Sequence, residues 1–252
     1  MYWDLLTSPE IDALERRIPV ILPVAATEQH GPHLPLATDR LIGEHFCKKI
    51  DEAISDQVLI LPTVSVGCSE HHLGFAGSLS VTHHTFLMQV EDILNSVFSH
   101  GFRNLVILNS HGGNQGIGTV ITEKFGFRHP DATLTFVTWW KAAGEAIFAL
   151  NDSGPGGVGH ACEFETSLML LIAPDLVRVK NIEKGRNQPT FRWAEGDMLR
   201  GSQASFYRTM RAMTPNGVFG SPEKASAEKG WEISRLVSES LVHIISDIRT
   251  SQ

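Results

Sequence analysis

The sequence is poor in cysteine and in basic residues, and it has no long apolar run. Its three cysteines are far apart and never form a C-x-x-C pair, which argues against a disulfide framework or a thiolate zinc site. The formal net charge of −7 argues against general binding to nucleic acid or to an anionic membrane, since both need clustered lysine and arginine. The longest apolar runs, such as "IPVILPVAA", have about half of the ~20 residues that a membrane span requires.

The amino-terminal stretch and the composition together indicate one domain in a reducing compartment. "MYWDLLTSPEID" carries acidic residues and no basic region, so no secretory signal is indicated and we expect a cytoplasmic protein. The 252 residues, 42% of them hydrophobic, are enough for one sizeable core, and we expect a single domain over residues 1–252.

Four short, continuous apolar runs predict buried parallel strands, at residues 19–25, 57–62, 104–109 and 133–138. Segments with helical spacing lie between and after them, at residues 39–54, 83–101, 114–127 and 223–249. This alternation predicts a compact α/β domain with a central, mostly parallel sheet flanked by helices. Segment 183–222 has few periodic signals, and its length favours a functional excursion such as a lid or an oligomer contact.

The stretch "VAATEQHGPHLPLATD" places acids and imidazoles directly after the first predicted strand. Glu28 and His30 are two residues apart, so in an extended segment their side chains project from the same side. Asp39 follows where the loop becomes a helix, where it could equally serve as an N-cap. Carboxylates and imidazoles are ligands of zinc, manganese and iron, so this loop is a candidate half of a metal site. We expect His33 to pack in the loop or to support a ligand from behind.

Two later clusters also carry ligand-type residues. His111 in "NSHGGN" follows strand 104–109, although a tight turn with an incidental histidine explains it equally well when taken alone. In "GHACEFETSLML", a helix starting near His160 would place Glu163 on the same face and Glu165 elsewhere. The alternative is a helix amino terminus, where acids favour the helix dipole. Burying these polar groups without partners or a metal would be costly.

Two further segments are candidates for the substrate side of a pocket. Glu70 and His71 lie in the glycine-containing loop "SEHHLGFAGSLS". Trp140 follows strand 133–138 and is expected either to wall an apolar pocket or to pack in the core. Because ligands bind outside the carboxyl ends of strands in open α/β sheets, the clusters are expected to converge there. Their carboxylates and imidazoles suit two bridged divalent ions, at a spacing of roughly 3.5–4 Å.

The chain resembles the creatininase (creatinine amidohydrolase) family in an ordered set of motifs: "EQHGPHLPLATD", "SEHHLGFAGSLS", "NSHGGN", "HACEFETSLML" and "GVFGSPEKASAEKG". The resemblance implies an α/β fold with two divalent metal ions per subunit and, commonly, a homo-hexamer. It implies that Glu28, Asp39 and His111 hold one metal, that His30 and Asp39 hold the second, and that Asp39 bridges them. It also implies that His160 acts on the substrate.

The chain departs from creatininase at four glycines that stand where creatininase has functional side chains: Gly112, Gly113, Gly156 and Gly157. Gly113 replaces a glutamate that binds the second metal. We infer that Glu163 supplies the missing ligand and a catalytic proton, with Glu165 as the second choice. The lost side chains also make creatinine a poor candidate substrate.

The sequence therefore predicts a metal-dependent hydrolase that opens a C–N amide bond of a small cyclic amide or formamide. A metal-activated water would attack the carbonyl carbon, and His160 or Glu163 would pass a proton to the leaving nitrogen. One alternative is a hydrolase of a lactone or of a cyclic dicarbonyl sugar derivative, and other relatives of the family act on a small peptide precursor. A second alternative is a non-catalytic metal-binding scaffold.

Overall fold

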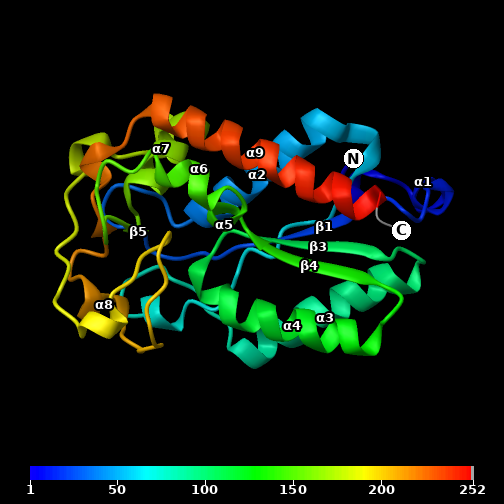
Figure 1. Cartoon of the computed structure of the whole chain (residues 1–252), viewed down its shortest axis with the longest axis horizontal. Coiled ribbons are helices and arrows are strands. Elements are labelled where there is room, and N and C mark those ends of the chain that lie inside the picture. Colours follow the sequence, from blue (N-terminus) through cyan, green and yellow to red (C-terminus); the bar gives the residue numbers. More distant parts are fainter. Residues whose placement is uncertain (251–252) are drawn as a thin grey trace.

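A four-stranded parallel sheet lies at the centre of the computed structural model, which describes residues 1–250 (Figure 1). Its strands are β1 (Val20–Val24), β2 (Leu59–Ile60), β3 (Asn104–Asn109) and β4 (Thr133–Thr138), in the order β2-β1-β3-β4. The register pairs Val24 with Asn109 and Asn109 with Thr138, so these strands end at the same edge. The predicted parallel sheet is confirmed, with β3 and β4 at their predicted bounds.

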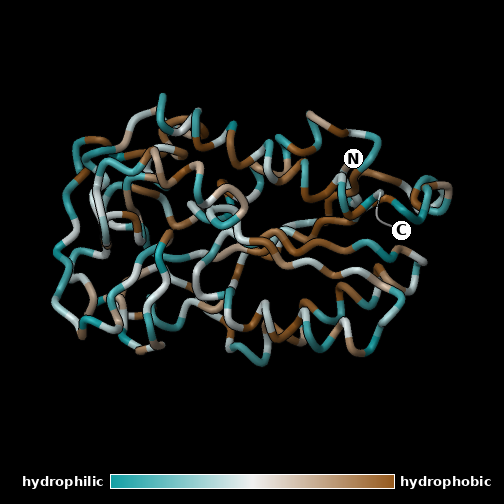
Figure 2. The backbone as a smooth tube through the Cα atoms, viewed as in Figure 1, coloured by the Kyte–Doolittle hydropathy of each residue, from teal (hydrophilic) through white to brown (hydrophobic). Residues whose placement is uncertain are grey.

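Helices cover both faces of this sheet. In Figure 1, α2 (Thr38–Ile54), α7 (Glu163–Ile172) and α9 (Ala227–Thr250) lie on one side, and α3 (His83–Ser99) and α4 (Gln115–Arg128) lie on the other. Successive strand side chains point to opposite faces. Thus Ile21 packs with the first group of helices, whereas Val20 and Leu22 pack with the second. Burial on both faces explains why the strands are continuously apolar, as the brown central strands of Figure 2 show.

The remaining elements are short. The α-helices are α1 (Ser8–Ala13), α5 (Trp139–Ala142), α6 (Gly144–Phe148) and α8 (Met210–Met213). Single 3₁₀ turns occupy Trp3–Leu5, Ser55–Gln57, Glu70–His72, Gly112–Asn114, Pro174–Leu176, Val179–Asn181, Arg192–Ala194 and Pro222–Lys224. None of the helices within residues 1–250 is long and apolar enough to cross a membrane.

A second, two-stranded antiparallel sheet pairs β5 (Val158–His160) with β6 (Phe219–Gly220). His160 therefore ends a strand and lies just before the helix, so it does not share a helix face with Glu163. Ala161 has φ of 50°, Cys162 is the N-cap, and α7 begins at Glu163. Figure 1 shows β5 and α8 at the end of the molecule away from the two termini. The excursion 183–222 contains α8 and β6, so it is folded against the sheet that carries His160.

Candidate metal centre

The loops at the carboxyl edge of the parallel sheet bring the predicted clusters together. Glu28 and His30 follow β1, His111 follows β3, and Asp39 lies in the first turn of α2. Asp39 is the central residue: its Oδ1 is 3.1 Å from His30 Nε2, and its Oδ2 is 3.1 Å from His111 Nδ1. Glu28 Oε1 is 3.3 Å from the same His111 nitrogen. A carboxylate between two imidazoles is placed as a ligand shared by two metals would be.

Glu165, and not Glu163, completes this group. Glu165 Oε1 lies 3.7 Å from His30 Nε2, and His30, His160 and Glu165 form one of the groups whose ligand atoms could hold a metal ion. The buried Glu163 carboxylate instead pairs with Lys229 and accepts hydrogen bonds from the amides of Asp152 and Ser153. The preference for Glu163 as ligand and proton donor is thus corrected, because α7 starts three residues after His160 and turns Glu163 away.

His160 faces the carboxylates as a neutral imidazole. Its Nε2 is 2.7 Å from the Gln29 carbonyl oxygen, to which only an N–H can donate, so Nδ1 carries the lone pair. That Nδ1 lies 3.7 Å from Glu28 Oε1. Burial, followed by the nearby His30, lowers the pKa of His160. The residue is therefore set to accept a proton or to bind a cation at Nδ1.

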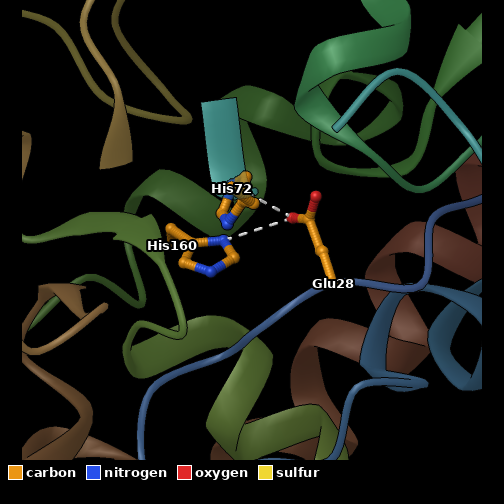
Figure 3. Close-up of side chains that lie close together, drawn as sticks. All are labelled: Glu28, His72 and His160. Carbon is orange, nitrogen blue, oxygen red and sulfur yellow. Dashed lines mark ion pairs between the residues drawn. The ribbon is translucent and has the colours of Figure 1, made fainter. Parts of the chain in front are cut away.

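His72 belongs to the site, although the sequence motifs did not single it out. Its Nε2 is 3.3 Å from Glu28 Oε1, and Gln29 Nε2 lies 3.0 Å from its Nδ1. Figure 3 shows His72 and His160 directed at the same oxygen of Glu28. The short 3₁₀ turn Glu70–His72 buries His72, and the doubled histidine was the only local signal for it.

The remaining residues predicted from the sequence lie at different distances from the centre. His71 and Trp140 line the cavity, whereas Glu70 points to the surface near His83, with half of its side chain exposed, and is not among the lining residues. His33 is buried behind the centre and is hydrogen-bonded to Thr166 Oγ1 at 2.9 Å.

The buried carboxylates of Glu28, Asp39 and Glu165 have surroundings that suit a bound cation. Glu28 Oε2 is buried without a hydrogen-bond partner, and Asp39 Oδ2 faces His111 Nδ1 at 3.1 Å without forming a hydrogen bond. No lysine or arginine within residues 1–250 forms an ion pair with Glu28, Asp39 or Glu165. Buried carboxylates that lack such partners are costly unless a metal or a protonated imidazole balances them.

The pKa shifts of His30 and His111 show the same charge imbalance. Burial would lower the pKa of His30 and of His111, yet both are raised, because Asp39 stabilises the charged form of His30 and Glu28 that of His111. The imidazoles thus take the role of cations beside these acids. Divalent metals would displace those protons.

A cavity of about 400 Å³ opens onto this centre. Carboxylates and imidazoles form its floor, and Trp140 contributes to one wall. Part of another wall comes from the excursion, through residues that include Asp197, Met198, Arg200 and Ser202. The excursion therefore shapes the site, as its length suggested.

Gly113 is required by close packing at the centre. A Cβ there would overlap the Cys68 carbonyl oxygen and lie 2.5 Å from His111 Nε2. We expect Gly113→Ala to destabilise the protein by about 1–3 kcal/mol and to reduce metal binding through displacement of His111. Thermal melts and metal analysis measure both effects. Gly116→Ala is the matched control, because a Cβ at Gly116 meets nothing within 4 Å. Equal behaviour of the two variants would contradict this packing argument.

Comparison with known sequences gives a family and several relatives. The family model "Creatininase: Creatinine amidohydrolase" matches residues 4–245. The mycofactocin precursor peptide peptidase of Mycobacterium tuberculosis is 29% identical, over 85% of this chain and 79% of its own. The creatinine amidohydrolase of Pseudomonas putida is 29% identical, over 90% of this chain and 87% of its own length. The 3-dehydro-scyllo-inosose hydrolase of Thermotoga maritima is 25% identical, over 98% of this chain and 83% of its own length.

Solved structures agree with the fold. A crystal structure of creatinine amidohydrolase superposes with a TM-score of 0.79 at 26% identity, covering 98% of this chain and 96% of the other. A creatininase variant of the Zn–Zn type and a creatininase named as the Mn form each match at 26% identity and a TM-score of 0.79, over 98% and 97% of the two chains.

Proposed function

Because the chain belongs to the creatininase family, we propose that it is a metal-dependent hydrolase of a C–N amide bond. The observation that carries the proposal is Asp39, which lies between His30 and His111 with one oxygen toward each. The centre opens onto a cavity large enough for a small substrate or for part of a larger one.

We propose that Glu28, Asp39 and His111 hold one divalent ion and that His30, Asp39 and Glu165 hold a second. Glu28, His30 and Asp39 form a group whose ligand atoms lie within 4.8 Å of one another, and so do His30, His160 and Glu165. Oxygen and nitrogen ligands accept zinc, manganese or iron. The Zn–Zn and Mn forms of creatininase favour the first two.

Bound metal ions lower the pKa of a coordinated water, so that hydroxide is available near pH 7. His160 would accept a proton at Nδ1 during attack on the amide carbon and return it to the leaving nitrogen as the C–N bond breaks. The Gln29 carbonyl fixes the orientation of the ring by accepting from Nε2. Burial lowers the pKa of His71 to about 4, so this cavity-lining residue is neutral and can contact an uncharged substrate group.

The candidate substrates include peptide amides besides the cyclic amides and formamides preferred from the sequence. Mycobacterial relatives are named as precursor peptide peptidases, so a peptide amide belongs among the candidates. The creatinine amidohydrolase relative supports a small cyclic amide. Both types of bond join a carbonyl carbon to nitrogen, and the same residues serve either one.

A second candidate is hydrolysis of a cyclic carbonyl sugar derivative. The observation that favours it is the Thermotoga relative named 3-dehydro-scyllo-inosose hydrolase, which matches 98% of this chain. The family resemblance also supports a homo-hexamer as the assembly, and the three buried free cysteines are compatible with a cytoplasmic location.

Purified protein with measured metal content tests these proposals against short peptides, cyclic amides, formamides, lactones and ketone-bearing cyclitols. We expect about two metal ions per chain and hydrolysis of at least one amide. Stripping the metals with a chelator should stop hydrolysis, and adding zinc or manganese back should restore it. Full activity in the stripped protein would overturn the metal mechanism. Metal binding without turnover of any compound would favour the scaffold hypothesis.

A further inference from the structure

A second hollow, of about 940 Å³, adjoins the cavity over the metal centre. The two hollows lie side by side, because they share six lining residues: Gln115, Trp140, Asp197, Met198, Arg200 and Gly201. The second hollow adds Lys141, Glu145 and Phe148 from α5 and α6. A substrate bound at the metal centre can therefore extend past Trp140 into a region of different chemistry.

The tight turn 197–200 holds Arg200 at the junction of the two hollows. Asp197 Oδ1 accepts hydrogen bonds from the amides of Leu199 and Arg200, and its Oδ2 accepts one from Gly156. The Met198 amide donates to the carbonyl of Val158 in β5 at 2.8 Å. Because β5 ends at His160, the turn that carries Arg200 is fixed to the strand that carries a residue of the centre.

The charged side chains of the second hollow differ in whether they have a bonding partner. The Arg200 guanidinium lies 4.9 Å from the ring centroid of Phe148, and no ion pair or side-chain hydrogen bond is described for it within residues 1–250. Lys141 likewise has no described ion pair. Asp197 is engaged by three backbone amides, which leaves Glu145 as the other acid of this hollow. Two cations without an ion pair in the described residues thus line the same hollow.

We infer that Arg200, assisted by Lys141, binds a carboxylate carried by the substrate, a step that rests on the proposed amide hydrolysis. A planar guanidinium stacked on an aromatic ring can still offer its N–H groups to a carboxylate in a two-point hydrogen bond. The presence of Glu145 in the same hollow favours a singly charged carboxylate over a doubly charged phosphate. Arg200 is thus a specificity residue that selects substrates with an acidic end or acidic side chain.

Binding of matched peptides tests the inference without requiring turnover. The probes are N-acetyl-oligoalanines of one to four residues, each as the free acid and as the carboxamide, and the same carboxamides with one alanine replaced by aspartate. Calorimetry is done on the metal-loaded and on the metal-stripped protein. We expect at least one acid to bind about tenfold more tightly than its amide in both states. The aspartate peptides distinguish a terminal carboxylate from a side-chain carboxylate.

Arg200→Gln should remove this preference, so that each acid binds no more tightly than its amide. Arg192→Gln is the matched control, because Arg192 lies in the same excursion, is exposed and lines neither hollow. The inference is overturned if no carboxylate peptide is preferred, if the preference survives Arg200→Gln, or if it needs the metals. Failure of every amide to be hydrolysed would count against the proposed function and would leave this binding result standing.

Discussion

Replacing Asp39 by asparagine should remove both metals and lower kcat/KM by at least about 10³-fold. The substitution keeps the shape of the side chain but removes the negative charge that His30 and His111 share at 3.1 Å on either side. A neutral amide cannot bridge two divalent ions as a carboxylate does. Elemental analysis of the purified variant gives the metal content per chain, and initial rates on the substrate found in the panel give the kinetic loss.

Glu44→Gln on the same helix is the control for Asp39→Asn. Glu44 pairs with Arg40 at 2.8 Å on the surface, and exposed pairs of this kind contribute about 0–1 kcal/mol. The control should keep two metals and the full rate. Two tightly bound metals in Asp39→Asn would show that Asp39 is not the shared ligand, whatever the effect on rate.

The parallel sheet and four long helices could be predicted because their signals are local. β3 is a continuous apolar run that is buried on both faces, and its bounds follow directly from the sequence. β2 is much shorter than its apolar run, with only Leu59–Ile60 paired with β1. The other edge strand, β4, keeps its predicted length, so hydrophobicity alone does not report where the pairing of a strand ends.

The metal centre could be only partly predicted, because one wall depends on distant pairing. His160 is extended since β5 pairs with β6 some sixty residues later, which no local pattern around "GHACEFE" encodes. Moving the helix start from His160 to Glu163 changes which glutamate faces the centre. His72 was missed for a similar reason: a single 3₁₀ turn decides which of two adjacent histidines lies beside Glu28.

The two glutamates of α7 should therefore fail in different ways when each is changed to glutamine. Glu165→Gln should lose the metal held with His30 and lower kcat/KM by about 10²-fold or more, with little change in the stability of the metal-free protein. Glu163→Gln should keep both metals but unfold more easily by about 1–3 kcal/mol, because it removes the buried one of the two acidic partners of the Lys229 ammonium and leaves only the exposed Asp152.

Metal content and urea unfolding of the stripped proteins separate these two effects. Lys229→Met serves as a companion variant, since it removes the cation of the same buried pair from the side of α9 and should also lower stability while retaining the metals. If Glu163→Gln loses a metal while Glu165→Gln retains two, the ligand assignment in α7 must be reversed. Glu163→Gln and Glu165→Gln both preserve side-chain size and lie two residues apart on one helix. A difference between these two variants therefore reports the direction in which each carboxylate points.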